Sequence, residues 1–261
     1  MALTFGGAIS DRVTITDPGN YPLLCTILVW HFPTTQTAFR RIWGQAGVGY
    51  IQDVQWVFGD TNSLQLAVDF YDGASYTGGA VAVSSTNIST NTWIFNAFVL
   101  NGNSGNPQIF TGTLLAAATE DGYATQTAAP ATGQPRGTGD DFLIGNVGTT
   151  TAYEGRIAVF ARVDRAMTLA EIQQWQFLPR VVADTKLFIH LGFAGTGTQP
   201  DWAGNGFSGA VTGATVSSHV PLGPLFGYDL GWYGNVGSRV VPDMWIARDL
   251  QRYVKHELVI F

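Results

Sequence analysis

The hexapeptide GNGFSG, residues 204–209, has the G-x-G-x-x-G spacing that is associated with dinucleotide binding. In that role the motif must follow a strand and open a helix, because the pyrophosphate rests on free amide groups at the helix N-terminus. Here the preceding Gln199-Pro200-Asp201 is turn-forming, and the following AVTGATV is β-branched. The glycines are therefore predicted to form a tight turn with positive φ before an edge strand.

The acidic residues lack the spacing of a glycoside hydrolase. Retaining chemistry needs two carboxyl groups about 5 Å apart. The chain has four glutamates, none beside another and none in an alternating acidic run: Glu120, Glu154, Glu171 and Glu257. A G-x-S-x-G elbow and a lysine-ended phosphate loop are also missing from the sequence. We predict no catalytic residues.

Calcium is the only metal ion that the sequence leaves as a candidate ligand. His31, His190, His219 and His256 are scattered, without the spacing of a zinc site. Oxygen-rich loop pairs could bind calcium, or could simply bond their own backbone as turn residues. The candidate pairs are Asp60 with Asn62, Asp69 with Asp72, and Asp140 with Asp141. The sequence leaves both interpretations open and indicates no other cofactor.

Composition excludes several partner classes. The formal net charge is −6 and basic residues form no cluster, so no nucleic-acid interface is predicted. No apolar stretch of about 18 residues predicts a membrane span, and the N-terminus does not read as a secretion signal. Charged residues make up only 12% of the chain, which favours a surface that packs against neighbouring subunits.

The elements that would position any site are mostly strands. Apolar runs such as LLCTILVWHF (23–32) and NTWIFNAFVL (91–100) predict strands, and residues 3–16 predict two short strands around the turn GGAISD. Residues 116–140, rich in Ala, Thr, Gly and Pro, predict a long surface loop or crossing segment. Thr168 and Glu171 form a T-x-x-E capping box that predicts one short helix, which Pro179 ends.

Three blocks resemble laminin-G-like, concanavalin-A-like jelly-roll domains. They are DFLIGNVGTTTAYEGRIAVFARVDRAMTLAEIQQW, LTFGGAISDRVTI and PDWAGNGFSGAVTGA. The third block follows the helix here, whereas in many members it precedes the opening strand, so the order resembles a circular permutation. The resemblance implies an all-β, two-sheet antiparallel sandwich of about a dozen strands. It implies no single function, because the fold hosts lectins, adhesion modules, hydrolases and virion proteins.

The first functional hypothesis is a non-enzymatic structural protein of a bacteriophage virion, a head decoration or tail component made in the host cytoplasm. A jelly roll over residues 1–223 would carry a C-terminal arm over 224–261, with a helix predicted in the arm. The arm would contact protein subunits of a larger assembly, including a homo-oligomer, because aromatic and Arg residues are enriched at interface centres. The alternative, which the sequence leaves open, is that the arm packs back on its own domain. The predicted contacts are Trp232, Tyr233, Trp245, Arg248, Arg252 and Phe261.

The alternative hypothesis is a carbohydrate-binding, lectin-like module. Sugars stack on exposed aromatic rings and hydrogen-bond to nearby polar groups. The candidates lie in or beside predicted loops: Tyr71, Asp72, Tyr76, Tyr123 and Tyr153. Isolated loop tyrosines can equally be partly buried structural residues, so the sequence leaves this site open.

Overall fold

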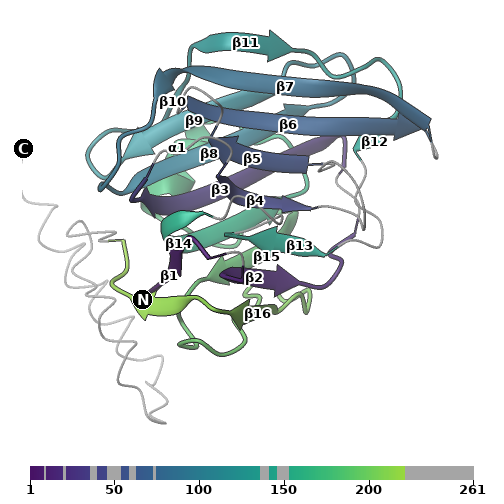
Figure 1. The fold of residues 1–261 in the computed structure, drawn as a ribbon. Helices are drawn as coiled ribbons and strands as arrows, with labels where there is room; N and C mark the ends of the chain where they lie inside the picture. Colours follow the sequence, from purple (N-terminus) through teal and green to yellow (C-terminus); the bar gives the residue numbers. More distant parts are fainter. Residues whose placement is uncertain are drawn as a thin grey trace, which may run out of the picture. The chain divides into compact units, whose positions relative to one another are not determined.

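The computed structural model of the chain describes residues 1–8, 10–19, 22–35, 40–45, 54–58, 63–72, 75–135, 141–145 and 153–220. Within them, strands form two antiparallel sheets that pack face to face, with a single short helix on the outside of one (Figure 1). The predicted all-β, two-sheet sandwich with one short helix is confirmed. The described part of the chain contains no helix with the length and apolarity of a membrane span.

Sheet A carries the helix. Its main path runs β10-β9-β8-β3-β14-β1-β17, and β15 also pairs with β14. In that order the strands are β10 (Thr119–Glu120), β9 (Gln108–Thr113), β8 (Ile94–Asn101), β3 (Leu24–Pro33), β14 (Glu154–Val163), β1 (Ala2–Gly6), β17 (Thr215–Ser217) and β15 (Thr185–His190).

Sheet B has the order β11-β7-β6-β5-β4-β13-β2-β16, and β12 pairs with β6. Its strands are β11 (Tyr123–Thr127), β7 (Ser75–Asn87), β6 (Ser63–Asp72), β5 (Val54–Phe58), β4 (Arg41–Gln45), β13 (Phe142–Ile144), β2 (Arg12–Ile15), β16 (Gly209–Thr212) and β12 (Gln134–Pro135).

The central strands of sheet A are buried on both faces, which explains their unbroken apolar runs. One core fills the space between the sheets, where Trp43 stacks on Phe142 with 5.6 Å between ring centroids. A second core lies on the outer face of sheet A, beneath α1 (Leu169–Phe177). There Trp30 and Trp175 pack against strand residues, and the Trp30 indole donates to the Gln176 backbone carbonyl at 2.8 Å.

The predicted helix start is confirmed in detail. The Thr168 hydroxyl accepts the backbone N–H of Glu171 at 3.4 Å, and the Glu171 carboxylate accepts the Thr168 N–H at 2.8 Å. This reciprocal pair satisfies amide groups that the first helical turn would otherwise leave without partners.

Residues 3–16 do form two strands, but these belong to different sheets. β1 lies in sheet A and β2 in sheet B, so the turn between them is a corner of the sandwich. Asp11 holds this corner, because its carboxylate accepts the Gly6 N–H at 2.7 Å. A second crossing lies beside it, where Gly213, with φ of +73°, joins β16 of sheet B to β17 of sheet A.

The prediction of one long loop over 116–140 is wrong in part. This segment contributes the short strands β10, β11 and β12, of which β11 and β12 extend sheet B. Their low apolar content reflects their place at sheet margins, where most of their side chains stay exposed.

GNGFSG forms the predicted tight turn. Gly204 and Gly206 have φ of +81° and +82°, and β16 begins at Gly209 as the edge strand of sheet B. Since the turn leads into strand β16 and not into a helix, it cannot hold a pyrophosphate in the dinucleotide-binding manner. Strand β17 pairs with β1, so the two ends of the described domain are adjacent, as a circular permutation would require.

Candidate functional site

Three neighbouring strands of sheet B place polar and aromatic side chains in one row. Gln134 of β12 is the register partner of Tyr71 of β6, and Tyr71 is the partner of Tyr76 of β7. Directly paired residues share a face of a sheet. Two residues further along β6, Asp69 is paired with Gly79. We call Asp69, Tyr71, Tyr76, Gly79 and Gln134 the β6–β7 platform.

The Tyr76 hydroxyl and the Asp69 carboxylate lie close together over Gly79. A Cβ atom at this glycine would lie 3.2 Å from the Tyr76 hydroxyl oxygen and 3.3 Å from Oδ1 of Asp69. Contacts this short are crowded, so glycine is the residue that lets a phenol and a carboxylate approach this position together. A ligand hydroxyl beside the phenol can donate to the carboxylate.

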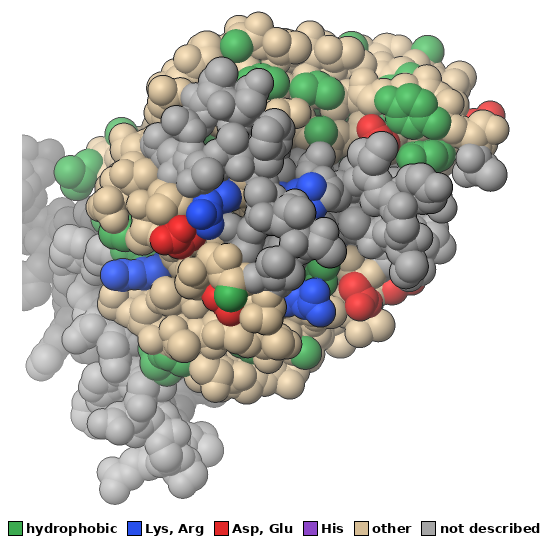
Figure 2. All heavy atoms as spheres, in the orientation of Figure 1, with side chains coloured by type: hydrophobic (Ala, Val, Ile, Leu, Met, Phe, Trp, Pro, Cys, Tyr) green, Lys and Arg blue, Asp and Glu red, His purple; other side chains and the backbone are tan. Residues whose placement is uncertain are grey.

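The two platform tyrosines present both a ring face and a ring edge. Their centroids are 5.7 Å apart with 69° between the ring planes. Tyr76 is 59% exposed, and Tyr71 is half-buried. Figure 2 shows hydrophobic side chains gathered between acidic groups on this part of the molecule, at the end of the β6–β7 pair in Figure 1. A stacking surface with carboxylates at its edge results.

A β-bulge in β7 shapes the backbone beneath the platform. The register shifts between Phe70 and Tyr71, and the extra residue, Thr77, turns its hydroxyl back to the Phe70 carbonyl at 3.1 Å. The same hydroxyl lies 3.3 Å from the Thr132 carbonyl, which ties the segment leading into β12 to β7. The site is therefore built on three hydrogen-bonded strands.

The structure brings together three of the five sequence-predicted sugar residues. Asp72 ends β6 and is exposed, beside Tyr71 and Tyr76. Tyr123 lies apart on β11, where its hydroxyl accepts the Ile109 N–H at 2.8 Å. Tyr153 is fully buried and contacts His31, so its ring cannot stack on a sugar. That part of the prediction is wrong, because the Tyr153 ring packs into the core between the sheets although its sequence context is typical of a loop.

Most other predicted site residues lie outside the described residues. These are Asp60, Asn62 and Asp140 of the calcium pairs and all six arm residues, Trp232, Tyr233, Trp245, Arg248, Arg252 and Phe261. Asp141 is described and exposed. Among the described residues, no three or more His, Cys, Asp or Glu side chains gather as metal ligands would.

The buried histidine His31 has a structural environment. Its Nε2 lies 2.6 Å from Asn96 Oδ1, and its Nδ1 lies 3.1 Å from the Tyr153 hydroxyl. Since the Asn96 amide donates to Thr111 Oγ1 at 2.9 Å, its oxygen accepts from His31 Nε2–H. Burial lowers the pKa of His31 to about 4, so the ring is neutral at neutral pH. This network holds β3, β8 and β9 together.

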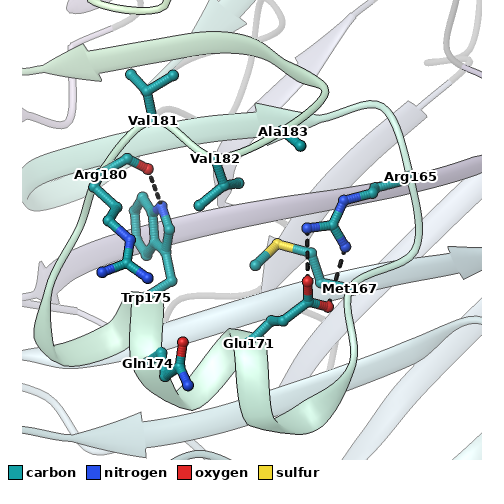
Figure 3. Close-up of a pocket in the computed structure, with 9 residues that line it drawn as sticks. All are labelled: Arg165, Met167, Glu171, Gln174, Trp175, Arg180, Val181, Val182 and Ala183. Carbon is teal, nitrogen blue, oxygen red and sulfur yellow. Dashed lines mark hydrogen bonds and ion pairs between the residues drawn. The ribbon is translucent and has the colours of Figure 1, made fainter.

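A pocket of about 370 Å³ lies beside α1 (Figure 3). The Arg165 guanidinium donates to both carboxylate oxygens of Glu171, at 3.0 and 2.8 Å, while Trp175 and Met167 form an apolar wall. Hydrogen bonding from Arg165 lowers the pKa of Glu171 to about 2, so this carboxyl group is no proton donor at neutral pH. Glu171 is committed to the helix cap and the ion pair.

Sequence reasoning missed an exposed aromatic pair, Phe193 and Trp202. Both lie in the connection between β15 and β16, which contains the GNGFSG turn. The available signal was an indole between Asp201 and a Gly- and Asn-rich turn, a context in which a large apolar ring has few neighbours to cover it.

Among solved structures, a Bacteroides ovatus protein described as a candidate carbohydrate-binding protein matches with a TM-score of 0.58 and 16% identity. The match covers 84% of this chain and 61% of that one, so this chain spans about three fifths of its length. The sialidase module CBM40 of Ruminococcus gnavus, bound to α2,3-sialyllactose, gives a TM-score of 0.46 at 11% identity, covering 65% and 95%. Domains LG4-5 of the mouse laminin α1 chain give 0.45 at 12% identity, covering 63% and 42%.

No protein-family model matches the sequence, and no curated protein matches it. The fold assignment therefore rests on the two-sheet topology and on the Bacteroides ovatus structure. The chain has the jelly-roll fold of laminin-G-like and concanavalin-A-like domains.

Proposed function

We propose that this chain is a non-catalytic carbohydrate-binding module and that the β6–β7 platform takes the sugar. The observation that carries the proposal is the close approach of the Tyr76 hydroxyl and the Asp69 carboxylate over Gly79, beside two tyrosine rings of which Tyr76 is 59% exposed. The likeness to a candidate carbohydrate-binding protein supports the same ligand class.

The proposed binding mode follows from the side chains present. The apolar face of a pyranose stacks on the exposed Tyr76 ring, which contributes by apolar burial and CH–π contact. One sugar hydroxyl lies beside the Tyr76 hydroxyl and donates to the Asp69 carboxylate, while the Tyr76 hydroxyl donates to a ring or hydroxyl oxygen. The Gln134 amide, at the end of the same row, can donate to one sugar oxygen and accept from another.

The virion hypothesis stays a prediction. Its predicted contact residues lie outside the described residues, and none of the three structures named above is described as a virion protein. The low charge content of the chain, 12%, is compatible with packing among subunits and equally with a neutral sugar-binding surface.

The test is a glycan array on the full chain, followed by calorimetry with the best ligand for the wild type and two variants. Tyr76→Ala should weaken binding at the platform by tenfold or more, on the scale of about 1.4 kcal/mol or above for a central stacking ring. Leu115→Ala, which removes an exposed apolar side chain outside the platform, is the matched control. Unchanged affinity at the platform in Tyr76→Ala would overturn the proposed site.

A further inference from the structure

Two large aromatic rings project from the connection between β15 and β16. Trp202 is 46% exposed and Phe193 is 39% exposed. Their centroids lie 4.9 Å apart with 88° between the ring planes, so one ring edge meets the other ring face. Leaving this much aromatic surface in water is unfavourable by the area rule, which makes an exposed aromatic pair a candidate binding surface.

Asp201 holds the backbone under Trp202 in one conformation. Its Oδ1 accepts the N–H groups of Phe188 at 3.1 Å and Ala203 at 2.9 Å. Its Oδ2 accepts those of Asn205 at 3.1 Å and Phe207 at 3.4 Å. A carboxylate that accepts four backbone amides both orders the turn and fixes where the preceding strand meets it. Trp202 is therefore presented on a preorganised turn, which lowers the entropy cost of binding.

Gln199 organises the Phe193 side of the same connection. The buried Gln199 amide donates to the carbonyls of Gly195 at 3.0 Å and Gly197 at 2.6 Å, and its oxygen accepts the Ala194 N–H at 3.4 Å. The loop that exposes Phe193 is thus tied internally at three points.

The polar groups next to the pair are two histidines. The ring of His190 lies 6.4 Å from that of Trp202 and 6.3 Å from that of His219. His219 Nδ1 donates to the Val220 carbonyl at 2.6 Å, which leaves its Nε2 as an acceptor in the neutral ring. Burial lowers the pKa of both histidines to about 4. Both imidazole rings are therefore neutral at neutral pH, and the N-terminal ammonium group lies close enough to lower both pKa values as well.

From this geometry we infer a second carbohydrate-binding site, in which a sugar ring stacks on Trp202 and Phe193 and hydrogen-bonds to His190 and His219. Exposed aromatic faces beside neutral imidazole donors and acceptors suit a saccharide. The inference rests on the proposed function for its ligand class but uses different residues.

The second site lies on the opposite side of the sandwich from the β6–β7 platform. In β15, Leu187 and Ile189 belong to the core between the sheets, while Phe188 belongs to the core on the outer face of sheet A. His190 follows Phe188 by two residues and so shares its face. The platform is on the outer face of sheet B, because Asp69 and Tyr71 alternate with the core residues Val68 and Phe70. Two sites facing apart allow one chain to bridge two glycans, with a gain in avidity on a multivalent surface.

The test compares full-length wild type, Trp202→Ala, Tyr76→Ala and Leu115→Ala by calorimetry with the best array ligand. Wild type and Leu115→Ala should bind two ligands per chain, and each of the other variants one. A single wild-type ligand that Tyr76→Ala abolishes would overturn this inference and leave the proposed function standing. A single ligand that Trp202→Ala abolishes would support the inference and overturn the platform. Absence of any saccharide binding would overturn both.

A site-specific readout uses protein labelled with 5-fluorotryptophan, with the Trp202 signal assigned from Trp202→Phe. In the Tyr76→Ala background that signal should shift on addition of ligand, and a static signal at saturating ligand would overturn the inference. The alternative occupant of this surface is a second copy of the chain. Sedimentation measured at several protein concentrations tests for such self-association. A self-association that Trp202→Ala abolishes would overturn the saccharide assignment.

Discussion

The rings of Tyr71 and Tyr76 meet edge to face across the β6–β7 pair, 5.7 Å apart. A one-residue register shift at Phe70/Tyr71 creates this contact. Without the extra residue, Tyr71 would stand opposite Thr77 and Tyr76 opposite Asp72, so the Tyr76 ring would point to the other face of the sheet. The bulge thus aims both rings at the same side of sheet B and brings the Tyr76 hydroxyl close to Asp69 over Gly79.

A side chain at Gly79 should disturb the platform without removing either ring. We expect Gly79→Val to weaken saccharide binding about tenfold or more, because its side chain displaces the Tyr76 hydroxyl and the Asp69 carboxylate from their positions. Calorimetry measures the change, and urea unfolding checks that the fold persists. Val81→Thr, a substitution two residues further along β7, is the control and should leave affinity unchanged. Equal affinity for Gly79→Val and wild type would show that the ligand does not use the Tyr76 hydroxyl and Asp69 together.

Asp201 should be important for stability as well as for the Trp202 surface. Asp201→Ala removes the acceptor of four backbone amides, and we expect the free energy of unfolding to fall by about 2–4 kcal/mol. Equilibrium urea unfolding gives the value. Asp17→Ala, in which the lost carboxylate accepts the Gly19 N–H at 3.0 Å, is the matched control with a smaller expected loss. Similar losses in the two variants would contradict the role assigned to Asp201.

The Gln176 side chain hydrogen-bonds α1 to the turn that follows β9. Its oxygen accepts the Ala118 N–H at 2.7 Å, and its amide donates to the carbonyls of Thr113 and Ala116 at 2.7 and 2.8 Å. Gln176→Leu should lower the free energy of unfolding by about 2–4 kcal/mol, because one buried and two partly buried backbone groups lose their partners.

The exposed Gln174, on the same helix, provides the control for Gln176. Gln174→Leu should change the free energy of unfolding by no more than about 0.5 kcal/mol. Thermal and urea unfolding of the two variants would reveal the difference. A Gln176→Leu protein as stable as Gln174→Leu would mean that the turn finds other partners.

Stability should fall on mild acidification. Burial lowers the pKa values of His31, His190 and His219 from 6.5 to about 4. Between these pH values the unfolded chain binds protons that the folded chain does not, so the free energy of unfolding decreases as pH falls. The contribution of these rings is complete above pH 6.5 and is lost by about pH 4. For the fully buried His31 the loss is on the order of 3 kcal/mol.

Urea midpoints measured across this pH range test the prediction. Hydrogen bonding from Arg165 lowers the pKa of Glu171 from 4.5 to about 2, so the stability from that ion pair is lost only below pH 4.5. The histidine contribution to stability therefore declines from pH 6.5, whereas the Glu171 contribution declines only from pH 4.5. His190→Gln should reduce the slope above pH 4.5, and a midpoint that stays constant between pH 6.5 and 4.5 would contradict the assigned histidine environments.

Local sequence patterns were enough to predict several elements. The T-x-x-E box at Thr168 predicts the helix start because both of its hydrogen bonds join residues three apart. The glycines of GNGFSG predict a turn because positive φ is a property of single residues. The long apolar runs predict strands buried on both faces, although not which elements cover them.

The sequence by itself determined the all-β class, the capped helix and the turn at GNGFSG, because these depend on neighbours along the chain. Only the tertiary structure decided which aromatic residues reach the surface. Tyr71 and Tyr153 are both tyrosines beside predicted loops, yet pairing with β12 and β7 leaves one on an outer face, and packing against His31 buries the other. Exposure depends on contacts with residues that are far away in the sequence. Such contacts also leave the Trp202 ring exposed and place β1 and β2 in different sheets.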